Sequence, residues 1–198
     1  MKELNSKYGK IIIRKAVKPD AKELIEYLNI IGGESDFLTF GAGQFERTIE
    51  QEEEFLLSTS KKKNALFIIA EIDGRIVGNL NFSAGPRERT AHTGEFGISV
   101  LKEHWGIGIG EELLKYLINW SKASGIIRKI NLRVRTDNTG GISLYKKLGF
   151  QEQGLIKRDF LIDGKFYDSL SMGLQIDWKY RGLYYGDKDM YRRLGRNI

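Results

Sequence analysis

Three glycines, Gly106, Gly108 and Gly110, occupy every second position in the stretch EHWGIGIGEELL, between a strand-like run (95–100) and a helix-like run (108–122). Glycine disfavours a helix interior by roughly 1 kcal/mol relative to alanine, so three glycines at a helix start need a reason. Without a Cβ, backbone N–H groups can approach phosphate oxygens at the positive end of a helix dipole. A tight turn with close backbone packing is the alternative, and three glycines favour the anion site.

The common nucleotide-binding patterns do not fit this loop. The spacing G-x-G-x-x-G from Gly106 would need a glycine where Glu111 stands, and no Gly-Lys-Ser/Thr follows. Glu111 and Glu112 suit the first turn of a helix, where negative charge is stabilised. They would have to project away from a bound phosphate.

Composition indicates an ordinary globular protein. The chain has 198 residues, 41% of them hydrophobic and 29% charged, which allows one well-buried core. No apolar run approaches the ~20 residues of a membrane span. The first residues lack the apolar segment of a secretory signal, and there is no cysteine. We therefore expect a cytoplasmic location and no membrane partner.

The absence of cysteine restricts the chemistry to sites without a thiol nucleophile or a thiolate metal ligand. Only His92 and His104 could supply imidazole, so we expect no metal. The net charge of +6 is dispersed, which makes nucleic acid an unlikely partner, although a basic tail at 175–198 leaves that alternative open. The same charge would favour an anionic cofactor.

Periodicity predicts a βα opening and then a hairpin in the first half of the chain. The dipeptide Asp73-Gly74 between two apolar runs is a strong signal for a tight turn with positive φ. The expected elements are a strand at 10–14, a helix at 19–28, a glycine-rich loop at 31–43, a helix at 45–57, and hairpin strands at 66–72 and 75–82.

The second half reads as strand, helix and strand, followed by another helix and a hairpin around Asp163-Gly164. A helical crossover can join parallel neighbours, so the sheet should be mixed. We expect one domain at 1–174 and a tail at 175–198 that packs on the body or a partner. The elements are strands at 95–100 and 129–135, a helix at 108–122 closed by Gly125, and a helix at 138–148.

Two motifs in order carry a family resemblance. The strand 95–100 with Trp105-Gly-Ile-Gly-Ile-Gly110 and a long helix, and then Asn138 with Leu-Tyr145 and Gly-Phe150, resemble the GCN5-related N-acetyltransferase (GNAT) family over residues 10–174. The resemblance implies a mostly antiparallel α/β (α+β) fold, with helices on both sheet faces and a parallel strand-helix-strand unit at the cofactor site. The stretch 157–172 is most similar to the branch that acetylates ribosomal-protein termini, amino acids and small amines.

The resemblance implies that acetyl-CoA is the acetyl donor and that backbone groups do most of the binding. The strand end would pair with the pantetheine arm, one of its N–H groups would face the acetyl oxygen, and the glycine loop would hold the pyrophosphate. The family commonly has Gln or Arg where this chain has Trp105. The implied cofactor-binding residues are Ile98, Ser99, Val100, Trp105, Gly106, Ile107, Gly108, Ile109 and Gly110.

Tyr145 is the candidate general acid. It lies two helical turns after Asn138, so both side chains project to one face. A phenol with a reference pKa near 10 stays protonated at neutral pH and can protonate a thiolate whose conjugate acid titrates near 8.5. The alternative is a tyrosine packed beside Leu144 and Leu148. Asn138 is expected to contact the cofactor or to act only as a helix N-cap.

Glu95 resembles a glutamate that serves family members as general base, directly or through water. An exposed strand-edge glutamate without a role is the alternative, and solvent is a further one. An α-amine is about a tenth neutral at pH 7, whereas a lysine-like amine is less than a thousandth neutral, so the need for a base depends on the acceptor. Since no cysteine exists, we predict direct attack in a ternary complex.

The loop between the first two helices is where the family usually forms its acceptor pocket. We expect Glu34, Phe37 and Phe40 to contact the acceptor, because acids would attract a cationic amine. A solvated loop with aromatic rings in the core is the alternative.

We therefore predict an acetyl-CoA-dependent N-acetyltransferase acting on a primary amine of a small molecule or of a peptide or protein N-terminus. The alternative is a non-catalytic, CoA-binding regulatory or structural module. The aromatic tail makes a homodimer reasonable.

Overall fold

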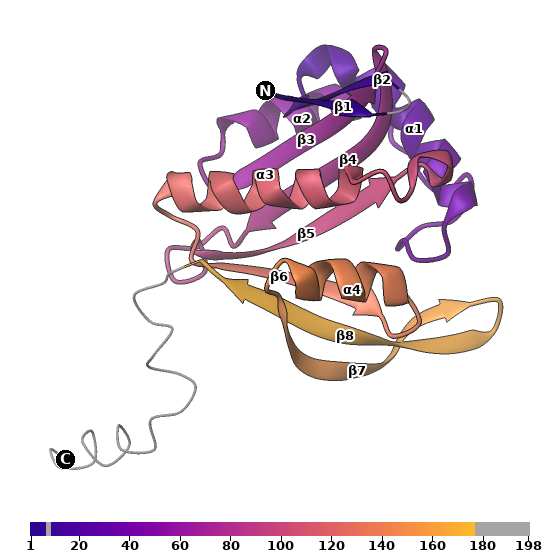
Figure 1. Ribbon diagram of the computed structural model, residues 1–198, viewed down its shortest axis with the longest axis vertical. Helices are drawn as coiled ribbons and strands as arrows, with labels where there is room; N and C mark the ends of the chain where they lie inside the picture. Colours follow the sequence, from indigo (N-terminus) through magenta and orange to yellow (C-terminus); the bar gives the residue numbers. More distant parts are fainter. Residues whose placement is uncertain (7–8, 177–198) are drawn as a thin grey trace, which may run out of the picture.

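Eight strands form one mixed sheet in the order β1-β2-β3-β4-β5-β6-β8-β7 in the computed structural model, which describes residues 1–6 and 9–176 (Figure 1). Neighbouring strands run antiparallel except for β5 and β6, which are parallel. The mixed, mostly antiparallel sheet is confirmed. The strands are β1 (Lys2–Ser6), β2 (Gly9–Lys15), β3 (Ala65–Ile72), β4 (Arg75–Ala84), β5 (Thr93–Val100), β6 (Lys129–Arg135), β7 (Gln151–Ile162) and β8 (Lys165–Gln175).

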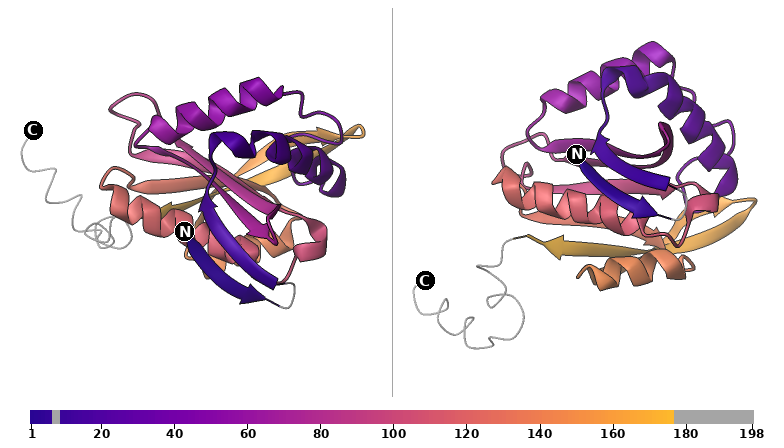
Figure 2. Two further views of the ribbon diagram at one scale, coloured as in Figure 1. Left: turned by 90° about the horizontal axis from the view of Figure 1, so that it is seen from above. Right: turned by 45° about the horizontal axis from the view of Figure 1, so that its top comes forward.

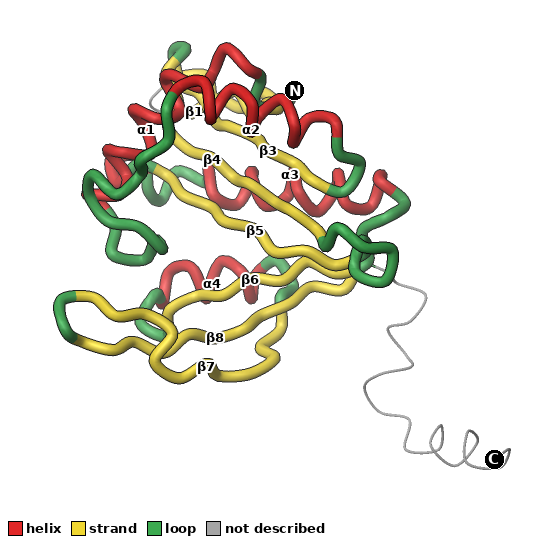
Figure 3. Tube along the Cα trace, turned by 180° about the vertical axis from the view of Figure 1, so that it is seen from behind, coloured by secondary structure: helices red, strands yellow, loops and turns green. Residues whose placement is uncertain are grey.

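Helices cover both faces of the sheet, as the resemblance implied. Helices α1 (Ala21–Glu34) and α2 (Ile49–Lys61) lie on one face, and α3 (Ile109–Ser124) and α4 (Thr139–Lys147) lie on the other (Figures 2 and 3). Two 3₁₀ turns, η1 (Lys18–Asp20) and η2 (Lys102–His104), precede α1 and the glycine loop. Helix α3 connects β5 to β6 as the predicted parallel crossover.

Both predicted hairpins form with two-residue turns. Asp73 (φ 50°) and Gly74 (φ 77°) connect β3 to β4, and Asp163 (φ 48°) and Gly164 (φ 75°) connect β7 to β8. Positive φ at both central positions is the geometry that matches the twist of the flanking strands. These turns fix the register of both hairpins.

Three of the differences from the sequence prediction have a clear structural reason. β1 was not expected, and it pairs with β2 from Lys2 opposite Ile13. Helix α1 continues to Glu34 through two glycines. Glycine at position 32 lets the following loop approach the helix, because a Cβ there would lie 2.7 Å from the Gly41 carbonyl oxygen. Helix α2 starts at Ile49, not at residue 45, because Thr48 and Gln51 form a capping box.

The core lies between the sheet and the helices. Strand β3 is buried along its whole length, while Leu24 and Leu56 on one face and Leu113 and Leu117 on the other are essentially inaccessible. Ile176 packs on the body of the domain, where it is 6% exposed and donates its N–H to the Arg128 carbonyl. Residues 177–198 of the predicted tail lie outside the described part.

No helix among the described residues is long and apolar enough to cross a membrane.

Candidate active site

The central feature is a split in the sheet between β5 and β6. Their parallel pairing covers only three residue pairs, Thr93 with Lys129 through Glu95 with Asn131, and beyond Glu95 the strands diverge (Figure 1). A cavity of about 1200 Å³ lies at this split and is lined by β5, β6, the glycine loop, α4 and the α1–α2 loop. The long-range topology therefore brings both sequence motifs to one cavity.

A second hollow of about 290 Å³ lies near the start of β3, lined by Lys15, Lys62, Lys63 and Trp120 among others. It has no carboxylate among its lining residues and is lined by neither sequence motif. The cavity at the split, which carries acids, a phenol and a helix N-terminus, is the candidate active site.

The glycine loop has the backbone conformation that the anion-site prediction requires. Gly106 (φ 77°) and Gly108 (φ 93°) are left-handed, and nothing lies within 4 Å of an added Cβ at either position. Conformation, and not crowding, therefore requires glycine there. Gly108 caps α3 without a side-chain hydrogen bond, so no side-chain cap occupies the first-turn N–H groups beside the cavity. This arrangement fits an anionic group such as a pyrophosphate.

The isoleucines between the glycines point inward. Ile109 is 1% exposed and Ile107 packs against the core. Gly78 of β4 leaves room for Ile109, since a Cβ there would lie 3.2 Å from its Cγ2. The alternation of glycine and isoleucine thus anchors the loop while its backbone faces the cavity.

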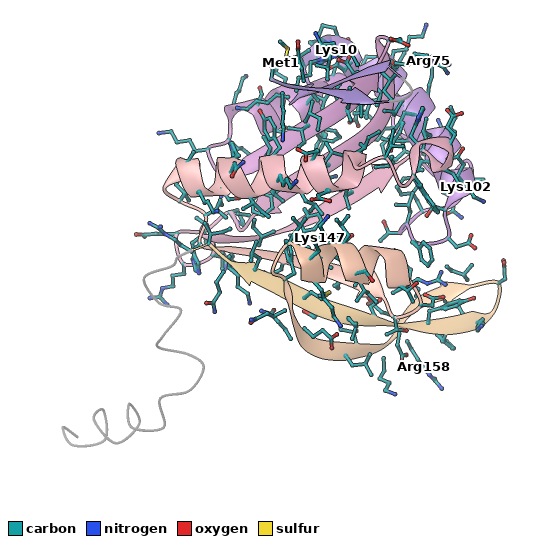
Figure 4. All side chains as sticks on the ribbon, viewed as in Figure 1. Met1, Lys10, Arg75, Lys102, Lys147 and Arg158 are labelled. Carbon is teal, nitrogen blue, oxygen red and sulfur yellow. The ribbon has the colours of Figure 1, made fainter. Side chains whose placement is uncertain are left out.

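The two glutamates after the loop are paired with lysines. Glu111 accepts hydrogen bonds from Lys147 of α4 (2.6 Å) and Lys115 (2.9 Å), and Glu112 pairs with Lys115 (3.0 Å) and Lys2. The hydrogen bond from Lys147, and next that from Lys115, lowers the pKa of Glu111 to about 2. Lys147 reaches from α4 toward α3 (Figure 4). These pairs neutralise the acids close to the proposed anion site.

The free edge of β5 presents backbone groups to the cavity. Gly85 donates to the Thr93 carbonyl (3.1 Å) and Leu101 to the Val77 carbonyl (2.9 Å), so odd-numbered residues of this segment pair with β4. By alternation, Ile98 and Val100 direct their N–H and C=O groups toward the split. An extended chain bearing amides can pair there in the manner of an added strand.

Ser99 has different neighbours from Ile98 and Val100. Its Oγ donates to Asn79 Oδ1 (2.9 Å) and lies 2.8 Å from the Tyr27 hydroxyl. Burial raises the pKa of Tyr27, which keeps the phenol protonated. The Ser99 side chain therefore faces the α1 side, where it forms part of a polar network below the cavity.

Tyr145 lies in α4 and is 8% exposed. Its ring contacts the rings of Phe96 and Phe150, with centroids 5.9 and 6.0 Å away. Burial raises the pKa of Tyr145 to about 12, because a phenolate would lose its hydration. The side chain lines the cavity, so the structure joins both alternatives: Tyr145 is a packed residue and also borders the candidate site.

Asn138 is the N-cap of α4. Its Oδ1 accepts the Gly141 N–H at 2.9 Å, and the residue also lines the cavity. A Cβ at Gly141 would lie 2.9 Å from this oxygen. The cap thus fixes where α4 begins and, two turns later, where Tyr145 lies.

Glu95 is half exposed and lines the cavity. Its Oε1 accepts a hydrogen bond from Arg133 Nε at 3.1 Å, and Arg133 also reaches Asp159 Oδ1 at 3.4 Å. Sequence reasoning missed Arg133 and Asp159 because they lie 38 and 64 positions after Glu95. The two carboxylates exceed the single guanidinium in charge, which favours a cationic acceptor.

The α1–α2 loop closes the other side of the cavity, where Phe37 and Phe40 line the wall. Glu34 differs from the expectation: it is the last residue of α1, its carboxylate accepts the Lys102 N–H at 2.8 Å, and it does not line the cavity. It joins α1 to η2 instead.

Arg135, which sequence reasoning also missed, holds this loop in place. It is 5% exposed, donates to the Asp36 carbonyl (2.7 Å) and pairs with Asp137. Its guanidinium stacks on Tyr167 at 3.8 Å and on Phe37 at 5.0 Å. Arg135 therefore connects the α1–α2 loop to the residues that start α4.

Within residues 1–6 and 9–176, no three His, Asp or Glu side chains gather in a group that could hold a metal ion.

A sheet split beside a left-handed glycine loop at a helix N-terminus is the arrangement expected of an acetyltransferase fold. The family model "Acetyltransferase (GNAT) family" matches residues 34–150. The chain belongs to this family, whose enzymes use acetyl-CoA as acetyl donor, and the family and fold predicted from the two motifs are confirmed.

Individual relatives agree with this assignment. The chain is similar to the L-amino acid N-acetyltransferase AaaT of Escherichia coli (33% identity, covering 53% of this chain and 65% of that protein). It is also similar to an N-alpha-acetyltransferase of Sulfurisphaera tokodaii (31%, covering 56% and 71%). A GNAT-family acetyltransferase structure from Streptococcus pneumoniae has 36% identity and a TM-score of 0.82, covering 84% of this chain and 99% of that one.

Proposed function

We propose that this protein transfers an acetyl group from acetyl-CoA to a primary amine of a small molecule or of a peptide N-terminus. The observation that carries the proposal is the single cavity that joins the glycine loop, the free edge of β5, Tyr145 and Glu95. Relatives named for L-amino acids and for N-alpha-acetylation support an amine of this kind. The cytoplasmic location and the homodimer expected from the sequence remain predictions.

The cavity offers separate places for the donor and the acceptor. The first-turn N–H groups of α3 would hold the pyrophosphate, and Ile98 and Val100 would pair with the pantetheine amides. The acceptor amine would enter between Phe37, Phe40 and the Glu95–Arg133 pair, where the excess negative charge attracts an ammonium group. Acetyl-CoA supplies a thioester carbonyl carbon that an amine can attack.

The proton transfers use Glu95 as the base and Tyr145 as the acid. As the amine nitrogen forms the new C–N bond and the C–S bond breaks, Glu95, directly or through water, accepts the proton that the nitrogen loses. Tyr145 donates its phenolic proton to the departing thiolate and regains one from solvent. The raised pKa of Tyr145 keeps that proton in place before transfer. No cysteine exists to carry the acetyl group, so attack is direct.

Calorimetric titration with acetyl-CoA, beside NAD and ATP, tests donor binding, and thiol release with a panel of amines then tests transfer. Selective binding of acetyl-CoA with amine-dependent thiol release is the expected result. Binding without release for any amine would favour a non-catalytic CoA-binding module. Binding of none of the three would contradict the proposal.

A further inference from the structure

The Trp105 side chain makes one hydrogen bond, to the strand that we propose binds the donor. Its Nε1–H donates to the Val100 carbonyl oxygen at 2.6 Å, while 48% of the residue is exposed. An indole has a single N–H donor and no acceptor. The one hydrogen bond that this side chain can donate therefore goes to the end of β5.

The Val100 carbonyl belongs to the free edge of β5. Leu101 N–H bonds Val77 of β4, so the Val100 carbonyl, one position earlier, is directed away from β4. The parallel pairing with β6 has already ended at Glu95. Val100 and Trp105 both line the cavity that contains the glycine loop. The indole N–H is thus hydrogen-bonded to a carbonyl oxygen on the edge of β5 that faces the split.

An extended donor arm competes for the same atom. The pantetheine arm of a CoA thioester carries two amide N–H groups, and each needs an acceptor when it leaves water. The even-numbered carbonyls of β5 are the acceptors on this edge. Because the indole already donates to the last of them, an arm that pairs with Val100 must share that carbonyl oxygen with Trp105 or displace the ring.

We propose that Trp105 is a displaceable cap on the cofactor-binding strand, which leaves the Val100 carbonyl when a CoA thioester binds and returns when CoA departs. The inference rests on the proposed function. The cap satisfies the strand edge in the free protein, lowers the affinity for CoA and its thioesters, and favours product release. It is a residue that sets donor affinity, distinct from the backbone cradle that holds the phosphates.

The test compares CoA and acetyl-CoA binding by calorimetry in the wild type, Trp105→Phe and Trp120→Phe. Phenylalanine keeps an aromatic ring at 105 but has no N–H to compete. Trp120 is the matched control: it is half-buried, stacks edge-on with Phe82 (centroids 5.8 Å apart) and does not line the cavity. Loss of one competing hydrogen bond should tighten binding of both ligands about three- to tenfold in Trp105→Phe, with no change in Trp120→Phe.

Tryptophan emission provides an independent readout of ring movement. CoA should change the emission of the wild type and of Trp120→Phe, and this change should disappear in Trp105→Phe. Unchanged or weaker binding in a folded Trp105→Phe protein would overturn the cap and leave the proposed function intact. Absence of CoA binding in all three proteins would refute the proposed function, and the cap with it.

Discussion

The ring of Tyr145 packs edge-on against the ring of Phe96, with centroids 5.9 Å apart and an interplanar angle of 70°. Because neighbouring residues in a strand face opposite sides of the sheet, Glu95 projects from the other face. The proposed acid and the proposed base therefore border the split from opposite sides. Each can be changed without touching the other, so their roles can be measured separately.

Replacing Tyr145 with Phe should lower kcat by about 10²-fold, the usual scale of a lost general acid, and leave acetyl-CoA affinity unchanged. The phenyl ring preserves the contacts with Phe96 and Phe150. Thiol release and calorimetry measure the two quantities. Acetylation at the wild-type rate would exclude Tyr145 as the proton donor.

The raised pKa of Tyr145 predicts that Tyr145→Phe changes how the stability of the protein depends on pH. In the folded protein the phenol titrates near 12, above its unfolded value of about 10. The phenol therefore stays protonated throughout the neutral range, and its contribution to folding is complete below pH ~10 and lost as the pH rises toward 12. Urea unfolding should show an alkaline loss of stability that is smaller in Tyr145→Phe.

Replacing Glu95 with Gln should lower kcat/KM at pH 7 at least tenfold for a lysine-like amine and much less for an α-amine. The reason is that the α-amine is already partly neutral at this pH, whereas the lysine-like amine depends on a base. Glu88→Gln, an exposed glutamate in the loop before β5, is the control. Equal losses with both amines would show that Glu95 binds the acceptor and does not take its proton.

Two glycine substitutions at opposite ends of α3 separate stability from cofactor binding. Gly108 (φ 93°) and Gly125 (φ 64°) are both left-handed and neither has an atom within 4 Å of an added Cβ. Alanine at either position should cost about 1–2 kcal/mol in the free energy of unfolding. Only Gly108→Ala should also weaken acetyl-CoA binding, about tenfold or more. Similar weakening in Gly125→Ala would trace the effect to a general disturbance of α3.

Replacing Arg135 with Lys should raise the KM for the amine severalfold and leave acetyl-CoA affinity unaltered. Lysine cannot donate to Asp36 and Asp137 while stacking on two rings, so the loop that carries Phe37 should loosen. Steady-state kinetics with each substrate varied in turn measures this split. Arg47→Lys is the control, because Arg47 stacks on Phe55 at 4.3 Å outside the cavity; equal KM changes would argue against a specific role for Arg135.

Replacing Lys147 with Met should raise the pKa of Glu111 from about 2 toward its ordinary value of 4.5. The stability from this pair is present above pH ~4.5 and lost as the pH falls toward 2, since the folded pKa is the lower one. Carboxyl chemical shifts across an acid titration report the change. Lys146→Met removes the neighbouring lysine, whose partner is Glu152 at 2.7 Å, and should leave the Glu111 titration where it is.

The elements that could be predicted from the sequence are those marked by a few adjacent residues. The two Asp-Gly turns, the left-handed Gly125 that closes α3 and the Asn138 cap of α4 each depend on a few adjacent residues, and each was predictable. Strand β1 was not predicted, because KELNS has no clear apolar alternation and its pairing depends on β2. Helix α1 runs past its predicted end at residue 28 into the stretch 31–43, which the glycine content indicated as a loop, whereas Gly32 serves the approach of Gly41.

The site was predictable only where a motif marked it. The glycine loop, Tyr145 and Glu95 stood in recognisable order, and all line the cavity. Arg133, Asp159 and Arg135 have partners up to 99 positions away in the chain, and nothing local distinguishes them from surface charges on a strand. The Trp105 contact with Val100 spans five positions, but it depends on the ring turning back across the strand edge.

The split between β5 and β6 also bears on unwanted pairing between strand edges of different molecules. Two strand edges with unsatisfied backbone groups normally invite pairing with a strand of another molecule. Here α3 and α4 flank the opening on one face and the Phe37 loop flanks it on the other. A strand of another molecule has side chains on both faces, which would clash with the helices and the loop. A narrower chain, such as a pantetheine arm, can enter. The walls that border the candidate site therefore also shield these two strand edges from pairing with another molecule.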